Sequence, residues 1–444
     1  MNKRSNRTKT LVGDISLIAI FKILNIISSF IIIPITINYV NTEIYGIWLT
    51  LYSIVTWFSV FDIGLGNGLR NTLAKCLANN EYIKSKQTVS TAYIIISIIS
   101  LTILSIGIVV IYILNWEEIL KIPNDYDGNI KQTLVLFMFG FCLRFVAQLI
   151  SNIFFALQKA YLSELLLLLG NLLTLTLILC FKNFFTDKLQ FLVFVLVYPG
   201  IICMIIYSLV FFKSKTYSFL SPSISFYDQK SIKDLFSLGI KFFILQCSSV
   251  ISYSIVNFLI LRFLSADEVT KYNIAYKYFS ILLIANNIIC TPLWSTFTEA
   301  YVKKDYTWMK STIKYLIYIW LFWCFIAIIM VSVSDFMYKL WTGIDLQIPL
   351  SLSIILAMFM LNCAWNGIFT SFINGVGKVY VQMITGIIPL ILWVPLIFIF
   401  VNILNFGVSG FALCMLIFNL LGTIFTTYQV KLILTNKAVG IWNK

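Results

Sequence analysis

The sequence predicts an all-α, polytopic integral membrane protein with about twelve transmembrane helices arranged as two six-helix lobes. Of its 444 residues, 60% are hydrophobic and only 11% are charged, and the mean hydropathy is +0.93. A typical soluble domain is roughly half apolar and a quarter charged. No stretch long enough to form a soluble domain lacks a strongly apolar run. We therefore expect nearly the whole chain to lie in or beside a bilayer.

A helix needs about 20 apolar residues to cross the hydrocarbon core. The predicted spans begin near Leu11, Tyr45, Thr88, Gln132, Leu162, Leu189, Leu235, Tyr272, Ser311, Gln347, Tyr380 and Gly410. Counted on alternate sides, Lys and Arg number about 20 on the side of the N-terminus and about seven on the other, and such an excess marks cytoplasmic loops. Both termini are therefore predicted to be cytoplasmic. The basic N-terminus precedes an apolar run that is too long for a signal peptide and lacks a cleavage site, so it reads as a retained first span.

The spans divide evenly at a polar segment. We expect an N-terminal lobe at 1–212, a cytoplasmic linker at 213–234 and a C-terminal lobe at 235–444. A shift of 219 residues aligns five identical pairs, which are Lys22 with Lys241, Ser29 with Ser248, Asn38 with Asn257, Lys159 with Lys378, and Tyr161 with Tyr380. Two lobes of six spans share one orientation, so an axis along the membrane normal would relate them. This arrangement suits a central cavity with alternating access.

The composition argues against several kinds of chemistry. The chain has no histidine, which is the commonest general base and zinc ligand. Its nine cysteines mostly lie in apolar runs without metal-binding or CxxC spacing. The net charge of +14 would suggest nucleic acid in a soluble protein, but here the basic residues lie in short loops between spans. We expect no catalytic residues, metal, cofactor or nucleic-acid partner.

Ionisable residues inside the spans are the best functional clues, because a charge at the bilayer centre costs at least about 2.5 kcal/mol and usually faces a wet interior. Lys22 in the first span and Arg144 in the fourth both fall near the midplane. We predict that they line a cationic cavity, with Lys241, the repeat partner of Lys22, as a third member. The alternative is that each pairs with a carbonyl or carboxylate as packing. For Lys241, snorkelling to the headgroups is a further alternative.

Three residues are candidates for a gate or an ion-coupling site. Asp62 and Glu164 are acids near the cytoplasmic ends of their spans, where helix capping or ion pairing is the alternative explanation. Arg70 follows Asp62 in the segment DIGLGNGLRN, whose alternating glycines are expected to loosen a helix end. Arg70 would then lie near lipid phosphates at a flexible gate, and a plain helix terminus is the alternative. No strand precedes the glycines, so they do not form a dinucleotide-binding loop.

The chain resembles bacterial O-antigen flippases of the Wzx type. These belong to the polysaccharide-transporter branch of the MOP superfamily, which also contains the MATE drug exporters. The resemblance is carried by NTEIYGIW at 41–48, DIGLGNGLRN at 62–71 and QKAY at 158–161, together with the length and the number of spans. It implies a MATE-like fold and transport of an undecaprenyl-pyrophosphate-linked oligosaccharide from the cytoplasmic to the periplasmic leaflet of the inner membrane. The cavity residues themselves are assigned by depth, not by family position.

This resemblance also implies partners. They are the lipid-linked oligosaccharide, membrane lipid, and polysaccharide polymerase or assembly proteins. Two alternatives remain open. A drug/cation antiporter of the same superfamily should carry acids in its cavity, whereas the deep charges here are basic. An O-antigen polymerase or ligase would be an enzyme, and such enzymes usually carry a large periplasmic loop that the predicted topology lacks.

Overall fold

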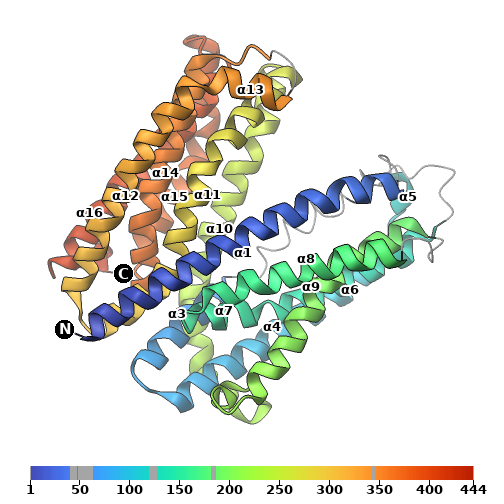
Figure 1. The fold of residues 1–444 in the computed structure, drawn as a ribbon, viewed down its shortest axis with the longest axis vertical. Coiled ribbons are helices and arrows are strands. Elements are labelled where there is room, and N and C mark those ends of the chain that lie inside the picture. The colour runs from blue at the N-terminus through green and yellow to red at the C-terminus, as the bar shows by residue number, and fades with distance from the viewer. Residues whose placement is uncertain are drawn as a thin grey trace. The chain divides into compact units, whose positions relative to one another are not determined.

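A computed structural model describes residues 2–40, 48, 64–119, 128–181, 187–342 and 346–443, and Figure 1 shows its course. The chain forms two compact units, residues 1–240 and 241–444. The boundary lies inside one helix, α10 (Gln229–Phe263), so its first part belongs to unit 1 and its second part to unit 2. All regular secondary structure in the described part of the chain is helical.

Unit 1 is a bundle of long helices joined by short turns. Its helices are α1 (Asn2–Val40), α3 (Leu65–Ala78), α4 (Tyr82–Ile113), α5 (Trp116–Ile119), α6 (Ile130–Ala147), α7 (Leu149–Ala156), α8 (Ala160–Phe181) and α9 (Lys188–Lys213), followed by the short 3-10 turns η2 (Ser218–Leu220) and η3 (Ile224–Phe226). Between α9 and α10, the chain therefore contains only these two turns. The expected fourth span is interrupted at Gln148, where α6 ends and α7 begins.

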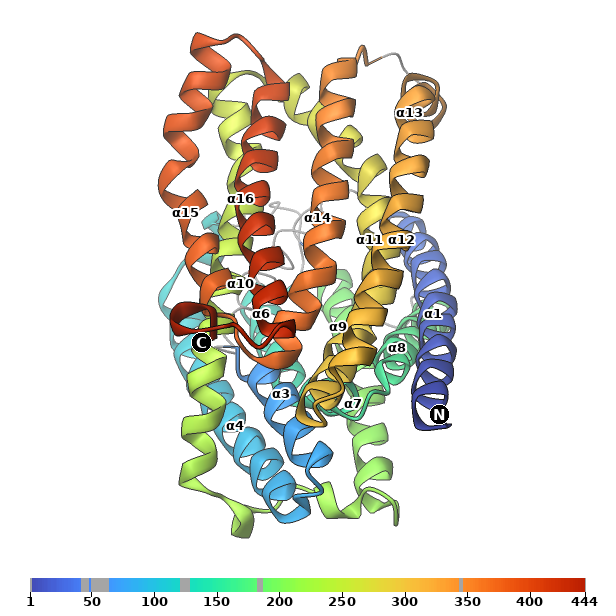
Figure 2. The same ribbon diagram turned by 90° about the vertical axis from the view of Figure 1, so that its left-hand side faces the viewer.

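Unit 2 repeats this plan. It contains the end of α10, α11 (Ala266–Val302), α12 (Tyr306–Ser332), α13 (Ser334–Thr342), α14 (Leu350–Val376), α15 (Tyr380–Ile397), the π-helical turn η4 (Phe398–Ile403), α16 (Val408–Leu434) and η5 (Gly440–Asn443). Figure 2 shows α11, α12, α14 and α16 running alongside one another. Prolines lie inside α11 and α15, at Pro292, Pro389 and Pro395.

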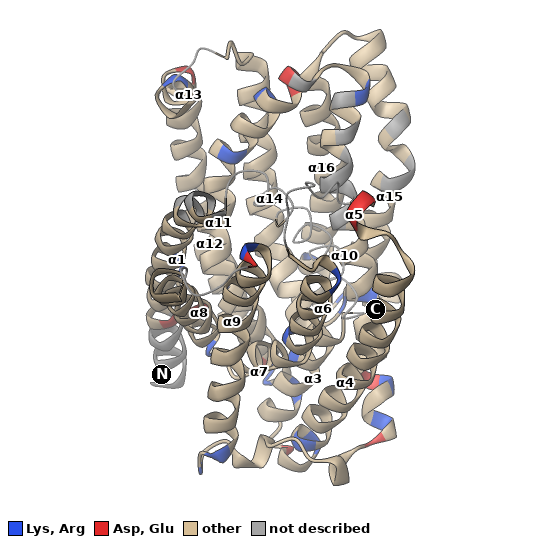
Figure 3. Cartoon of the chain, turned by 90° about the vertical axis from the view of Figure 1, so that its right-hand side faces the viewer, with Lys and Arg blue, Asp and Glu red and all other residues tan. Residues whose placement is uncertain are grey.

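Nine helical segments of the described residues are long and apolar enough to cross a bilayer. They correspond to the expected spans that begin near Leu11, Thr88, Gln132, Leu162, Leu189, Tyr272, Ser311, Gln347 and Gly410. The span expected from Tyr45 lies largely outside the described residues. The two expected near Leu235 and Tyr380 coincide with α10 and α15, whose side chains are described only in part. Figure 3 shows that charged residues are sparse along the helices.

Helix pairing recurs in the same order in both units. In unit 1, α6 packs on α4 and α9, and α8 packs on α9; in unit 2, α14 packs on α12 and α16, and α15 packs on α16. Likewise, α3 packs on α4 and α7, as α11 packs on α12 and α14. The turn with Lys159 precedes α8, and the turn with Lys378 precedes α15. Two Lys-containing turns of the proposed repeat thus occupy corresponding places in their units.

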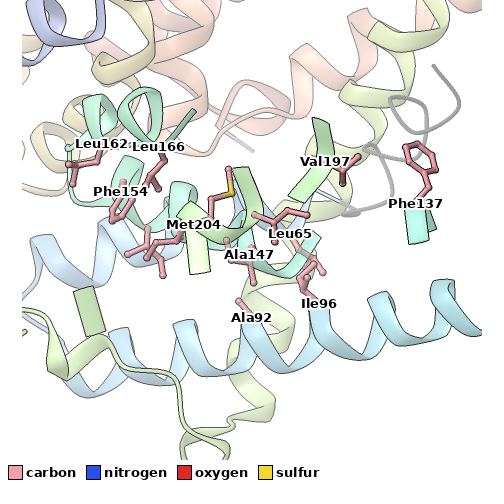
Figure 4. Packing of buried hydrophobic residues seen from close by; sticks show 14 of the residues in the cluster. Leu65, Ala92, Ile96, Phe137, Ala147, Phe154, Leu162, Leu166, Val197 and Met204 are labelled. Atoms are coloured by element: carbon pink, nitrogen blue, oxygen red, sulfur yellow. The ribbon is translucent and has the colours of Figure 1, made fainter. Parts of the chain in front are cut away.

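Each unit has its own apolar core. Figure 4 shows part of the core of unit 1, where Leu65 of α3, Ile96 of α4, Phe154 of α7 and Leu166 of α8 lie in one cluster. All four side chains are at most 1% exposed. The core of unit 2 is formed mainly by α10, α11, α14, α15 and α16, with Ala327 of α12 and Tyr338 of α13. Lipid tails are as apolar as these side chains, so the hydrophobic effect does not drive helices together inside a bilayer. Close packing of this kind contributes to helix association instead.

Candidate functional site

Lys22 lies in α1, within the apolar stretch Val12–Ser29. Its side chain is half-buried, and it forms no hydrogen bond or ion pair with any described residue. Packing against a carboxylate of the described chain therefore does not account for this charge. An ammonium group in such a place needs water or an anionic ligand.

Arg144 lies in the last turn of α6, four residues before the break at Gln148. It is also half-buried, and its guanidinium has no hydrogen-bond or ion-pair partner within the described ranges. Lys22 and Arg144 stand on different helices of unit 1, and both α1 and α6 pack on α9. The structure places the two cations in the same unit.

A polar cluster that the sequence reasoning missed joins α1 to α8. The Asn25 side chain donates to the carbonyl of Glu164 at 3.1 Å, and the Asn171 amide donates to Oδ1 of Asn25 at 3.2 Å. The same Asn171 nitrogen lies 3.3 Å from the Ser28 hydroxyl and 3.4 Å from that of Ser29. Asn25 is one turn after Lys22, so the cluster extends the polar character of α1 beyond the charge itself. In the sequence, the feature that could have indicated this cluster is the presence of asparagines within otherwise apolar runs.

We expect Asn171→Leu to lower the thermal stability of the detergent-solubilised protein. The change removes the amide that holds Asn25 and the two serines, and interhelical hydrogen bonds of this kind contribute about 0.6 to 2 kcal/mol. The matched control is Thr176→Val in the same helix, because the exposed Thr176 hydroxyl bonds only to its own helix. Equal melting temperatures for the two variants would show that the cluster does not hold α1 to α8.

The three gate or coupling candidates are placed differently. Asp62 lies outside the described residues. Glu164 is half-buried in α8, and its carboxylate makes no hydrogen bond or ion pair with the described part of the chain. Arg70 is 4% exposed, and its guanidinium carbon lies 4.7 Å from the centre of the Phe155 ring on α7. Arg70 is therefore buried inside unit 1 and makes a cation–π contact there. The expected gate would instead have placed it beside lipid phosphates.

The glycine-rich segment around Arg70 is a regular helix, contrary to the expected loosened end. Gly64 takes a left-handed conformation with φ 66°, and α3 begins at the next residue and continues through Gly66 and Gly68. A Cβ on Gly68 would lie 2.8 Å from the carbonyl oxygen of Leu235. The glycine thus permits a close approach between α3 and the first part of α10, and its role here is packing.

Lys241 lies in the part of α10 that belongs to unit 2. Its side chain is half-buried and has no hydrogen-bond or ion-pair partner in the described ranges, like that of its repeat partner Lys22. By contrast, Lys277 of α11 is exposed, and a long basic side chain in that position can extend its charge toward the headgroups.

The two lysines of the repeated turns do have partners. Lys159 donates to the Tyr217 hydroxyl at 2.6 Å and lies 5.0 Å from the centre of that ring. Burial opposes the charge of Lys159, but the hydrogen bond to Tyr217 and the nearby phenols outweigh it and raise the pKa of the ammonium group. Lys378 donates to Asn443 and lies 5.2 Å from the Tyr301 ring. These lysines tie turns to neighbouring segments and are not free for a ligand.

Within the described residues, no group of three or more His, Cys, Asp or Glu side chains is placed to hold a metal ion. The candidate groups for ligand binding are therefore the unpaired cations Lys22, Arg144 and Lys241. Such groups can hold an anion through charge-assisted hydrogen bonds, which are roughly twice as strong as neutral ones.

Comparison with solved structures shows the fold. The fold matches the crystal structure of a point mutant of a MATE protein with a TM-score of 0.77. The match covers 96% of both chains, which are 13% identical in sequence. It also matches a MOP superfamily transporter from Pyrococcus furiosus with a TM-score of 0.76 at 12% identity, over 96% of this chain and of that chain. The chain is therefore an all-helical, multi-pass membrane protein with a MATE-like fold. This confirms the predicted fold class and the fold that the resemblance implied.

The family follows from the sequence itself. Residues 11–298 match the model of the polysaccharide biosynthesis protein family, and the chain belongs to that family. A Yersinia pseudotuberculosis protein with the provisional name of O-antigen export protein is 22% identical over 364 residues, which cover 80% of this chain and 81% of that protein. A Salmonella typhi protein provisionally named as an O-antigen transporter is 24% identical over 345 residues, 76% of each chain. Both of these provisional names describe transport.

Proposed function

We propose that this protein is a flippase for undecaprenyl-pyrophosphate-linked O-antigen or polysaccharide repeat units. It would move them from the cytoplasmic to the periplasmic leaflet of the bacterial inner membrane, with both of its own termini in the cytoplasm. The observation that carries the proposal is the pair of half-buried cations Lys22 and Arg144, which lack a described partner in apolar helices of a polysaccharide biosynthesis family member. The provisional names of the Yersinia and Salmonella relatives support the same substrate class.

A pyrophosphate is the part of this substrate that most needs help inside a bilayer. Its negative charge would lose its hydration there, and a positively charged side chain in a poorly hydrated site compensates for that loss better than it could in water. Lys22 and Arg144 supply such charges in unit 1, and Lys241 supplies one in unit 2. Arg144 can also bind a phosphate through two parallel hydrogen bonds.

The recurring helix pairing of the two units supports transport by alternating access. Two lobes of like orientation, at 1–212 and 235–444 with a cytoplasmic linker at 213–234, would be related by an axis along the membrane normal, as in other transporters built from parallel repeats. Each lobe would then present its cations first to one leaflet and then to the other. Polysaccharide polymerase and assembly proteins would receive the exported units, and membrane lipid would surround the polyprenyl chain.

The two alternatives are less well supported. A drug/cation antiporter needs acidic groups to attract its substrate, but the charges that the sequence places near the midplane, Lys22 and Arg144, are basic. An O-antigen polymerase or ligase would be an enzyme, whereas the named relatives of this chain are transporters.

The test is to delete the gene in its host and ask which leaflet holds the lipid-linked oligosaccharide. We expect complete, unpolymerised repeat units to accumulate out of reach of a non-permeant periplasmic probe, and restoring the gene should reverse this. If the units become accessible to the probe but stay single, polymerisation is the missing step and the flippase assignment is wrong.

A further inference from the structure

Unit 2 contains a cavity whose lining is neutral, unlike the cationic residues Lys22, Arg144 and Lys241. Its volume is about 170 Å³, and residues of α10, α14, α15 and α16 line it. The wall consists of Leu245, Ser248, Phe359, Asn366, Gln382, Thr385, Gly386, Pro389, Trp393, Met415, Phe418, Asn419 and Gly422. An engineered protein cavity of about 150 Å³ binds benzene, so this space is large enough for one six-membered ring.

No charged side chain is found among these lining residues. An ionised ligand group would therefore enter the cavity without a counter-charge, and such burial is costly. The wall is nevertheless rich in neutral hydrogen-bonding groups, namely two asparagines, a glutamine, a serine, a threonine and the indole of Trp393. The ligand that fits this wall is uncharged and carries both donors and acceptors.

Two buried polar atoms at the cavity lack partners. Oε1 of Gln382 and Nε1 of Trp393 have no hydrogen bond to any described residue. One is an acceptor and the other a donor. Leaving a buried polar group unsatisfied costs about 1 to 3 kcal/mol. Both atoms are closed to water in this conformation, so a ligand hydroxyl, which can donate and accept, would reach them only after the side chains rotate toward the cavity.

The helix geometry of α15 adds a further acceptor. Pro389 has no N–H, so the carbonyl of Thr385, one turn earlier, lacks its regular helical donor. Both residues line the cavity. Backbone carbonyls released in this way inside a bilayer need another donor.

The two asparagines are fixed by their neighbours in a way that keeps their donors available. Oδ1 of Asn419 accepts from Asn362 at 2.7 Å, and Oδ1 of Asn366 accepts from the Thr426 hydroxyl at 2.9 Å. Each oxygen is thus occupied, while neither amide nitrogen donates to a described residue. The cavity therefore offers amide donors as well as the acceptors on α15.

Aromatic rings complete the wall. Trp393 and Phe418 lie with their ring centres 5.6 Å apart at an angle of 54°, and Phe359 is a third lining ring. Sugar rings present apolar C–H faces as well as hydroxyl groups. A neutral wall of amides, hydroxyls and aromatic rings matches both aspects.

We infer that this cavity in unit 2 is a subsite for a neutral sugar residue of the transported oligosaccharide. The inference rests on the proposed function and deepens it, because it separates recognition of the sugar from recognition of the pyrophosphate. The pyrophosphate is bound by cations such as Lys22 and Arg144, and the sugar is bound by Gln382, Trp393 and the two asparagines.

The test is a binding measurement on the full-length protein in nanodiscs with two probes. One probe is the neutral oligosaccharide released from the host's lipid-linked pool by mild acid, and the other is undecaprenyl pyrophosphate without sugar. Trp393→Phe removes the indole donor and keeps an aromatic ring, and Gln382→Leu removes the unpaired acceptor. We expect each change to weaken oligosaccharide binding about five- to tenfold and to leave binding of the sugar-free lipid unchanged.

Unit 2 offers matched controls for both changes. Nε1 of Trp323 and Oε1 of Gln246 are also buried without a described partner, but neither residue lines the cavity. Trp323→Phe and Gln246→Leu should therefore leave oligosaccharide affinity at the wild-type value. Equal weakening in the control and test variants would overturn the subsite.

A third variant fills the space. A Cβ on Gly422 would meet only the Thr385 hydroxyl, at 3.9 Å, so a larger side chain there would extend into free volume. We expect Gly422→Leu to reduce oligosaccharide binding more than tenfold, roughly the loss of two hydrogen bonds. Unchanged oligosaccharide affinity in folded Gly422→Leu protein, or an equal loss for both probes, would refute the subsite. The gene-deletion result tests the flippase assignment separately, so either idea can fail alone.

Discussion

Lys22→Met and Arg144→Met are each expected to reduce export of the repeat unit at least about tenfold, and the double variant is expected to abolish it. Under the proposed function, each variant would lose a charge-assisted hydrogen bond to the pyrophosphate, and such a bond is worth about 1.5 to 3 kcal/mol. Neither cation has a described partner within the protein, so removing it leaves no buried acid uncompensated there. Protein in the membrane should therefore stay at the wild-type level. The measurement is the fraction of lipid-linked oligosaccharide that a periplasmic probe can reach.

The control for these variants is Lys277→Met in α11. Lys277 is a lysine in a long membrane helix too, but its side chain is exposed. We expect normal export from this variant. Lys22→Arg should keep most of the activity, because it preserves the charge. Full export by both single Met variants would show that these cations do not bind the substrate, even if the protein proved to be a flippase.

Gly375→Ala is expected to cause the largest loss of stability from a single methyl group. A Cβ on Gly375 of α14 would lie 2.5 Å from the carbonyl oxygen of Trp294 and 3.0 Å from Cβ of Phe297, both on α11. The Thr298 hydroxyl also donates to the Gly375 carbonyl at 2.8 Å, so the helices cannot separate without breaking that bond. Overpacking of this kind costs about 1 to 3 kcal/mol. The melting temperature in detergent should fall by several degrees.

The matched control is Gly200→Ala in α9. This glycine is also inside a membrane helix, but a Cβ there would meet nothing within 4 Å. Alanine in a helix interior is favoured over glycine by about 0.5 to 1 kcal/mol, so the control should melt at the same temperature or higher. A melting temperature for Gly375→Ala equal to that of Gly200→Ala would mean that α11 and α14 pack less closely than the structure shows.

The close glycine contacts also show where sequence reasoning reaches its limit. The alternating glycines near Arg70 were expected to loosen a helix end, but Gly68 lies within α3 and permits backbone contact with α10. Glycine is used both in flexible ends and in tight helix contacts, and the two uses look alike in one sequence. Only the neighbouring helix distinguishes them.

The sequence alone determined the fold class and the residues worth testing. Hydropathy and span length depend on composition within one segment, so nine of the expected spans could be placed before any tertiary contact was known. The depth of Lys22 and Arg144 likewise follows from counting residues along a helix. The polar cluster around Asn171 and the neutral cavity beside Trp393 could not be found this way. They depend on how helices are rotated against one another, and hydropathy that is high on all sides of a helix does not specify which face meets its neighbour.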